Sequence, residues 1–115
     1  MNPAWTRRKL TELHPKWVDA GGPGIYNQDG SQAPERTGIG FLCDCPCGCG
    51  AMLSIDFANP LDGGPPYGTP PHWKRTGDTW DTMVLTPSVL RTDTCRWHGF
   101  LGGPDGKSPG WMVPV

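Results

Sequence analysis

The chain has 115 residues, of which 17 are Gly and 14 are Pro, and its formal net charge is −1. The length predicts one domain, and the scattered Lys and Arg residues give no electrostatic footprint for a phosphate backbone, so we expect no nucleic-acid partner. Leu, Ile, Val and Phe together number only 19. So small a set of core residues predicts that folding needs a disulfide framework or a structural metal.

Residues 1–36 are predicted to form an irregular N-terminal arm. A helix-compatible stretch runs from Arg7 to Leu13 and ends before Pro15, and Gly- and Pro-rich turns follow it. No apolar leader follows Met1 and no run of about 18 apolar residues occurs, so we expect neither export nor a membrane-spanning segment. The thiols are therefore expected in a reducing compartment.

Two runs of alternating apolar residues flank a cysteine-rich turn. Their apolar positions share one parity and are Ile39, Phe41, Cys43, Leu53, Ile55 and Phe57. Because side chains alternate across a strand with period two, this pattern predicts an antiparallel hairpin over residues 38–57. Cys43 continues the inward parity, so we interpret it as a small buried residue and not as a metal ligand.

The rest of the chain predicts loops and short strands. Residues 58–72 hold five prolines and are expected to form an exposed loop. Short β-compatible runs lie at 80–85, 88–91, 100–101 and 111–113. We therefore predict a mainly β fold, a small loop-rich antiparallel sheet with two metal-binding turns. Residues 37–115 are expected to form a zinc-binding β domain that follows the extended N-terminal arm.

Five candidate metal ligands lie in two turns. The first turn places three thiols on a Cys-Pro-Cys-Gly-Cys segment, and the second is a Cys-x-x-His turn. The candidates are Cys45, Cys47, Cys49, Cys95 and His98. Structural zinc prefers a closed tetrahedral shell of Cys and His, so we predict Zn²⁺ as the cofactor. Because five candidates exceed four positions, either one first-turn cysteine stays outside the shell or His98 is not a ligand.

An iron–sulfur cluster is the rival interpretation of the same residues. Three cysteines and a histidine could hold iron, and Cys95-x-x-His98 matches half of a Rieske motif. The Cys-x-His half of that motif does not occur in the sequence. The spacing therefore favours zinc over iron.

The sequence offers little support for catalysis. If water took the fourth metal position, Asp44 or Asp93 could act as a general base beside the ion. Ser88 and His98 could form a nucleophile pair, but this serine lacks the strand–turn–helix setting of a nucleophile elbow, and the histidine suits a metal better. His72 is expected to be solvated or packed on tryptophan. We therefore favour a non-enzymatic role and leave the enzymatic one open.

Several motifs together resemble those of a known family. They are Phe41-x-Cys-x-Cys-Pro-Cys-Gly-Cys-Gly50, Leu85-Thr-Pro-Ser-Val89 and Cys95-x-x-His98. Over about residues 37–113 the chain resembles an uncharacterised family of small domains found in tailed-phage and bacterial genomes. The resemblance implies a compact β domain with a zinc site and, for some bacterial members, association with ubiquitin-like conjugation genes. It implies no established activity.

Tryptophan and tyrosine residues in irregular segments favour contacts with other proteins. We therefore predict a non-catalytic, zinc-stabilised interaction or assembly module, in the form of a minor structural or accessory protein of a phage. Its partners are expected to be proteins, including a symmetric phage assembly, and its location the bacterial host cytoplasm or the virion. The alternative is a small zinc hydrolase or an accessory factor of a ubiquitin-like conjugation system.

Overall fold

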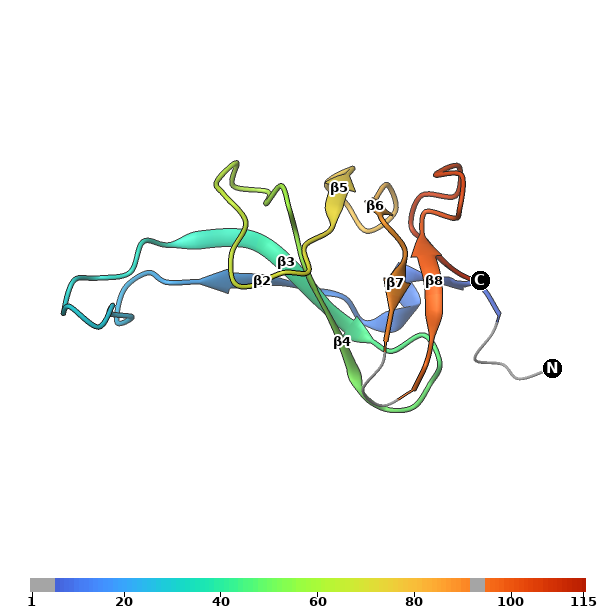
Figure 1. Ribbon diagram of the computed structural model, residues 1–115, viewed down its shortest axis with the longest axis horizontal. Helices are drawn as coiled ribbons and strands as arrows, with labels where there is room; N and C mark the ends of the chain where they lie inside the picture. Colours follow the sequence, from blue (N-terminus) through green and yellow to red (C-terminus); the bar gives the residue numbers. More distant parts are fainter. Residues whose placement is uncertain (1–5, 92–94) are drawn as a thin grey trace.

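The computed structural model describes residues 6–91 and 95–115 and is mainly β, as the sequence predicts (Figure 1). A 3₁₀ helix, η2 (Leu10–Leu13), precedes most of the strands. The strands are β1 (Arg8–Lys9), β2 (Lys16–Ala20), β3 (Arg36–Asp44), β4 (Met52–Asp56), β5 (Lys74–Thr76), β6 (Val84–Thr86), β7 (Val89–Leu90), β8 (His98–Leu101) and β9 (Trp111–Pro114). None of the described residues forms a helix that is long and apolar enough to cross a membrane.

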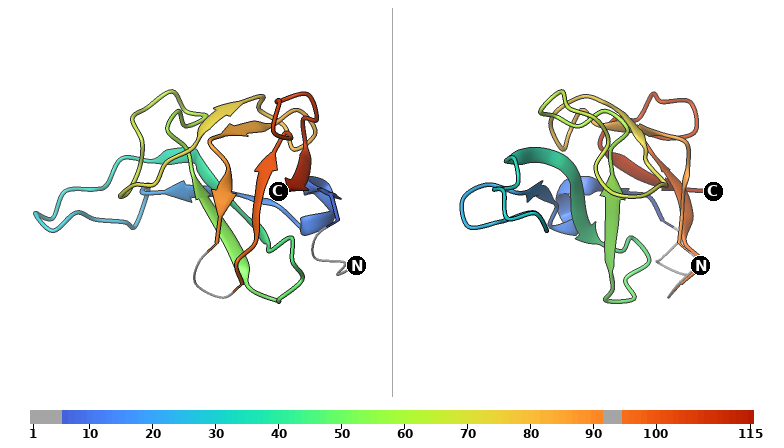
Figure 2. Two further views of the ribbon diagram at one scale, coloured as in Figure 1. Left: turned by 45° about the vertical axis from the view of Figure 1, so that its right-hand side comes forward. Right: turned by 60° about the vertical axis from the view of Figure 1, so that its left-hand side comes forward.

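The described strands form three small antiparallel sheets. One has the order β1-β9-β8-β7, a second has the order β2-β3-β4, and the third pairs β5 with β6. In Figures 1 and 2 the β3–β4 hairpin lies beside β7 and β8, whereas the tip of the β2–β3 hairpin extends away from the body. One core cluster joins the first two sheets, because it contains Phe41 and Ile55 together with Trp97 and Met112.

The β3–β4 hairpin confirms the predicted alternation. Phe41 is paired with Ile55 and Cys43 with Leu53, and all four side chains are buried. The cysteine-rich segment therefore forms the turn of this hairpin, and the register that buries the apolar face also fixes where the turn begins.

Part of the segment predicted as an irregular arm is built into the fold. Leu10 and Leu13 of η2 are buried in the core, and β2 pairs with β3. Trp17 in β2 stacks on Trp80, with ring centroids 3.8 Å apart. The helix-compatible stretch forms β1 and then a 3₁₀ turn, because its first residues pair with β9 and do not continue a helix.

The β-compatible run at 80–85 becomes a strand only from Val84. Before it, the Thr82 amide donates to the Thr79 carbonyl at 3.3 Å, and the two threonine hydroxyls lie 2.7 Å apart. These local bonds compete with sheet pairing and close a turn. The strand β6 is therefore shorter than the sequence pattern predicts.

Replacing Trp17 by Ala should lower the free energy of unfolding by about 2–4 kcal/mol. The substitution removes the stack on Trp80 and the edge contact with Phe57. Tyr26→Ala at the hairpin tip, where the side chain is 65% exposed, should change it by less than about 0.5 kcal/mol. Chemical denaturation measures both values, and equal effects would show that β2 does not stabilise the domain.

Candidate metal centre and serine–histidine pair

Four cysteine thiols meet where the β3–β4 turn approaches the start of β8. The Sγ atoms of the cluster all lie within 4.8 Å of one another, and they belong to Cys45, Cys47, Cys49 and Cys95. Cys45 Sγ lies 3.3 Å from both Cys47 Sγ and Cys95 Sγ. Since Cys45 and Cys95 are 50 positions apart in the sequence, the cluster joins two distant turns.

The sulfur spacing suits a tetrahedral metal site. With Zn–S bonds of about 2.3 Å, the edges of a tetrahedron of sulfur atoms measure about 3.8 Å. The 3.3 Å contacts and the 4.8 Å upper limit bracket that value. The four thiols could therefore hold one metal ion, as the two cysteine-bearing turns predict.

Two glycines and two backbone bonds shape the first turn. The Cys45 amide donates to the Ala51 carbonyl, and the Gly48 amide donates to the Cys45 carbonyl, both at 3.0 Å. Gly48 and Gly50 have φ angles of 78° and 85°, in the left-handed region that glycine adopts without a side-chain penalty. The chain can therefore reverse tightly enough to bring three thiols from one short segment together.

The pKa values of the clustered thiols are shifted in different directions. Burial raises the pKa of Cys45 and of Cys47. Burial also opposes ionisation of Cys95, but hydrogen bonds from the Cys47 thiol and the Trp97 amide outweigh it, so the pKa of Cys95 is lowered. Neighbouring thiolates repel one another, and a bound cation is what allows all four to ionise together.

Two further sequence candidates lie outside the four-thiol cluster. Cys43 is fully buried in the core, and burial raises the pKa of its thiol to about 12, which fits the interpretation of this residue as a buried non-ligand. His98 is also absent from the cluster within the described part of the chain. Of the two alternatives that the sequence left open, the geometry favours four thiols without the histidine.

His98 instead faces Ser88. Its Nε2 atom lies 2.9 Å from Ser88 Oγ, a distance at which the hydroxyl donates to an imidazole protonated on Nδ1. Both residues are half-buried. In such a pair the imidazole can accept the hydroxyl proton while the oxygen attacks an electrophile. The sequence predicts no role for the pair, because Ser88 lacks the strand–turn–helix setting of a nucleophile elbow and His98 suits a metal better.

The register between β7 and β8 creates this pair. Leu90 is paired with His98 and Val89 with Gly99, so Ser88 lies diagonally across from His98 on the same face of the sheet. A Cβ atom at Gly99 would lie 2.4 Å from the Trp97 ring. The absence of that side chain lets Trp97 pack into the core while His98 faces the other side.

Hydrogen bonds to the main chain hold both residues of the pair. Trp73 Nε1 donates to the Ser88 carbonyl at 3.2 Å, and the Val115 amide donates to the His98 carbonyl at 2.9 Å. The imidazole also packs near Phe100, with ring centroids 6.3 Å apart. The pair is therefore positioned from both of its strands.

The remaining sequence candidates are engaged elsewhere or are not described. Asp44 Oδ2 lies 2.8 Å from His14 Nδ1, and the Asp44 side chain is 49% exposed. His72 Nε2 lies 3.2 Å from two carbonyl oxygens of the proline-rich loop. Asp93 lies outside the described residues. The contacts of Asp44 and His72 give neither side chain a part in the serine–histidine pair.

We expect Cys95→Ser to lose bound metal, because it removes one of four sulfur ligands. His98→Ala and Cys43→Ala should both retain one metal ion per chain, since neither side chain belongs to the cluster. Elemental analysis of the purified variants measures the metal-to-protein ratio. Loss of metal from His98→Ala would make this histidine a ligand and contradict the four-thiol assignment.

One family model matches the chain over residues 23–106, and its description is "Bacterial ubiquitination-like system serine protease (BubE)". No curated protein and no solved structure shows significant similarity to the chain. The matched segment covers more than half of the sequence and contains the four clustered cysteines, Ser88 and His98. The chain therefore belongs to the BubE family of bacterial ubiquitination-like system serine proteases.

Proposed function

We propose that this protein is a serine peptidase in which Ser88 is the nucleophile and His98 is the general base. The observation that carries the proposal is the 2.9 Å hydrogen bond between Ser88 Oγ and His98 Nε2. A serine hydroxyl is a weak nucleophile until an adjacent base removes its proton. The family description, which names a serine protease, supports the same assignment independently.

The proposed reaction is acyl transfer through an ester of Ser88. The Ser88 oxygen attacks the carbonyl carbon of the scissile bond while His98 Nε2 takes the hydroxyl proton. The tetrahedral intermediate then collapses, the C–N bond breaks, and His98 gives that proton to the leaving amine. Water attacks the ester, His98 takes one of its protons, and the bond to the Ser88 oxygen breaks as that oxygen regains a proton. The products are a carboxylic acid and an amine.

We assign zinc to the four-thiol cluster and give the ion a structural role. Four sulfur ligands fill a tetrahedral shell, so no coordination position remains for a hydrolytic water. The hydrolytic chemistry therefore falls to the serine–histidine pair. The metal instead ties the turn before β4 to the segment before β8, and structural zinc sites contribute about 10–16 kcal/mol to folding in zinc-finger peptides.

The substrate class is inferred from the family description. A protease of a ubiquitination-like system acts within a pathway that joins one protein to others. Such a pathway contains peptide or isopeptide bonds at the C-terminus of its ubiquitin-like protein, either in a precursor or in a conjugate. We infer that the scissile bond lies at such a C-terminus, and that the principal partner is the ubiquitin-like protein itself.

This proposal follows the alternative interpretation of the sequence more closely than the main one. The family match favours a component of a ubiquitin-like conjugation system and agrees with protein partners. It gives no support to a structural role in a phage particle or to a symmetric phage assembly. We retain zinc as a structural ion. We propose that the serine, and not the metal, carries out the hydrolysis.

Ser88→Ala and His98→Ala should each lower the rate of cleavage of a ubiquitin-like protein fused through its C-terminus to a reporter domain. Each variant removes one half of the hydrogen-bonded pair, and we expect losses of at least about 10³-fold. Ser108→Ala serves as the matched control, because Ser108 is also half-buried and has no proposed role. Mass spectrometry of the products measures the rate and locates the cleaved bond.

Cleavage that persists in Ser88→Ala but stops after chelation of the metal would overturn the serine mechanism and support a zinc hydrolase. If the wild-type protein binds the ubiquitin-like protein without cleaving it, and Ser88 does not react with serine-directed fluorophosphonates, the chain would be a non-catalytic accessory factor.

A further inference from the structure

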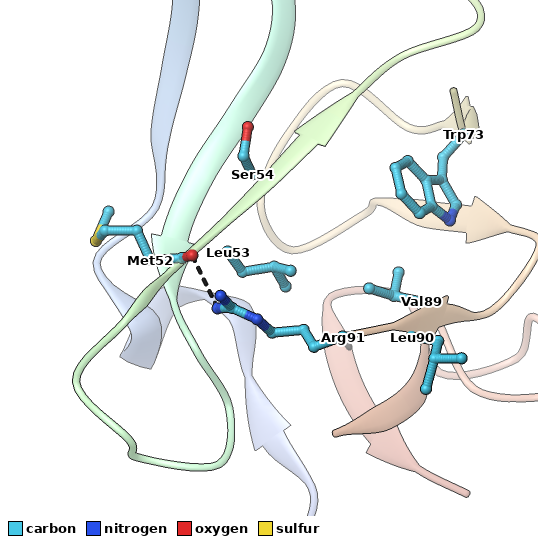
Figure 3. A pocket seen from close by; sticks show the side chains of 7 residues that line it. All are labelled: Met52, Leu53, Ser54, Trp73, Val89, Leu90 and Arg91. Atoms are coloured by element: carbon cyan, nitrogen blue, oxygen red, sulfur yellow. Dashed lines mark hydrogen bonds between the residues drawn. The ribbon is translucent and has the colours of Figure 1, made fainter. Parts of the chain in front are cut away.

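A pocket of about 250 Å³ lies between the edge strands β4 and β7 (Figure 3), and two of the residues that line it, Val89 and Leu90, directly follow Ser88 in the sequence. Trp73 lines it toward one end and Arg91 toward the other. Pockets that enclose whole small-molecule ligands usually measure roughly 300–1,000 Å³. This pocket is smaller, so its volume suits one amino-acid side chain with a short stretch of main chain.

The outer edge of β4 borders the pocket. In the ladder with β3, the Phe57 amide donates to the Ile39 carbonyl. Because backbone groups in an antiparallel ladder alternate between its two sides, those of Met52, Ser54 and Asp56 point away from β3. β4 therefore directs a row of main-chain donors and acceptors toward the side on which the pocket lies.

At the two ends of this stretch of β4, the main-chain carbonyls already accept hydrogen bonds from other residues. The Met52 carbonyl accepts a hydrogen bond from Arg91 Nη1 at 2.8 Å, which Figure 3 shows as a dashed line. The Asp56 carbonyl accepts one from the Trp73 amide at 2.8 Å. Ser54 lies between Met52 and Asp56 and lines the pocket. The stretch of β4 main chain that borders the pocket between these two hydrogen bonds is therefore short.

The outer edge of β7 forms the opposite border. The Arg91 amide donates to the Trp97 carbonyl at 2.9 Å. The preceding residue, Leu90, therefore points its amide and carbonyl away from β8. Edge strands of this kind accept an added extended peptide through their main-chain groups.

Leu90 and Trp73 link the pocket to the serine–histidine pair. Leu90 lies two residues after Ser88 and is paired with His98, and Trp73 both lines the pocket and donates to the Ser88 carbonyl. The walls are partly apolar, because buried Val89 and the 55% exposed Leu90 contribute to them. An extended peptide that reaches Ser88 along β7 would therefore place a side chain at this pocket.

We propose that the pocket is the specificity site of the peptidase and takes an apolar side chain from the substrate residue whose carbonyl carbon Ser88 attacks. The substrate is then an extended protein segment whose main chain pairs along Leu90 of β7. Leu90 is the residue that determines the preference, because its side chain borders the pocket from the exposed side. This inference rests on the proposed function, since it requires Ser88 to be the nucleophile.

The test uses diphenyl phosphonate analogues of three amino acids: valine, aspartate and lysine. In each reaction a bond forms between the Ser88 oxygen and phosphorus, His98 takes the hydroxyl proton, and phenol leaves. A small fluorophosphonate without an amino-acid side chain reports the basal reactivity of Ser88. For the wild-type protein we expect the valine analogue to react at least about 10-fold faster than either charged analogue.

Charge-swap variants of Leu90 separate a specificity role from a structural one. Leu90→Asp should favour the lysine analogue over the aspartate analogue by about 10-fold, and Leu90→Lys should reverse that order. The ratio of two rates in one variant cancels any change in the basicity of His98, which lies across from Leu90. If one of the two variants does not fold, the order of rates in the other can still be compared with that of the wild-type protein.

Ile25→Asp is the matched control, because Ile25 is 51% exposed, close to the 55% of Leu90, and lines a different pocket. It should keep the wild-type order of rates. A wild-type protein that reacts with the fluorophosphonate but shows no preference for valine, or an order of rates that neither Leu90 variant changes, would overturn the pocket assignment alone. Failure of Ser88 to react with the fluorophosphonate would overturn the proposed function, and this inference with it.

Discussion

The joining of two distant turns by four thiols is the constraint on which the rest of this domain depends. Three of the thiols follow β3, and the fourth precedes β8, 50 positions after Cys45 in the sequence. A chain with 17 glycines and 14 prolines has much conformational entropy to lose and little apolar area to offset it. A metal ion held by both turns would close a long loop and supply stabilisation that the small core does not.

The same constraint places the candidate site. Met52 and His98 begin β4 and β8, and each follows a clustered cysteine by three residues. One of these strands borders the pocket, and the other carries His98, which we propose as the general base. Ser88 reaches the base because β7 pairs with β8, and Trp97 anchors the opposite face of that ladder in the core. The core and the proposed catalytic pair are therefore both placed by the same two turns.

The hairpin and the cysteine-rich turn could be predicted from the sequence because their signals are local, whereas the choice between His98 and a third first-turn cysteine as a ligand was left open and depends on the fold. Period-two alternation predicts β3 and β4, and the short spacing of Cys45, Cys47 and Cys49 indicates a metal-binding turn.

The Ser88–His98 pair depends on the register of a two-residue strand, which short-range patterns do not specify. Its histidine also follows Cys95 at a spacing typical of metal ligands. In the fold, His98 begins β8, and the pairing of that strand turns the imidazole toward Ser88. The pairing of β2 with β3 was missed for the same reason, because it too is a long-range contact.

The most direct test of this account is the reaction of a small fluorophosphonate with metal-loaded protein and with protein stripped of metal by a chelator, followed by peptide mass spectrometry. The account predicts a single adduct on Ser88 in the metal-loaded protein. It also predicts a reaction at least about 10-fold slower without metal, because the pair is held by strands that the thiol cluster positions. An adduct on another residue, or an equal rate at Ser88 in both forms, would contradict it.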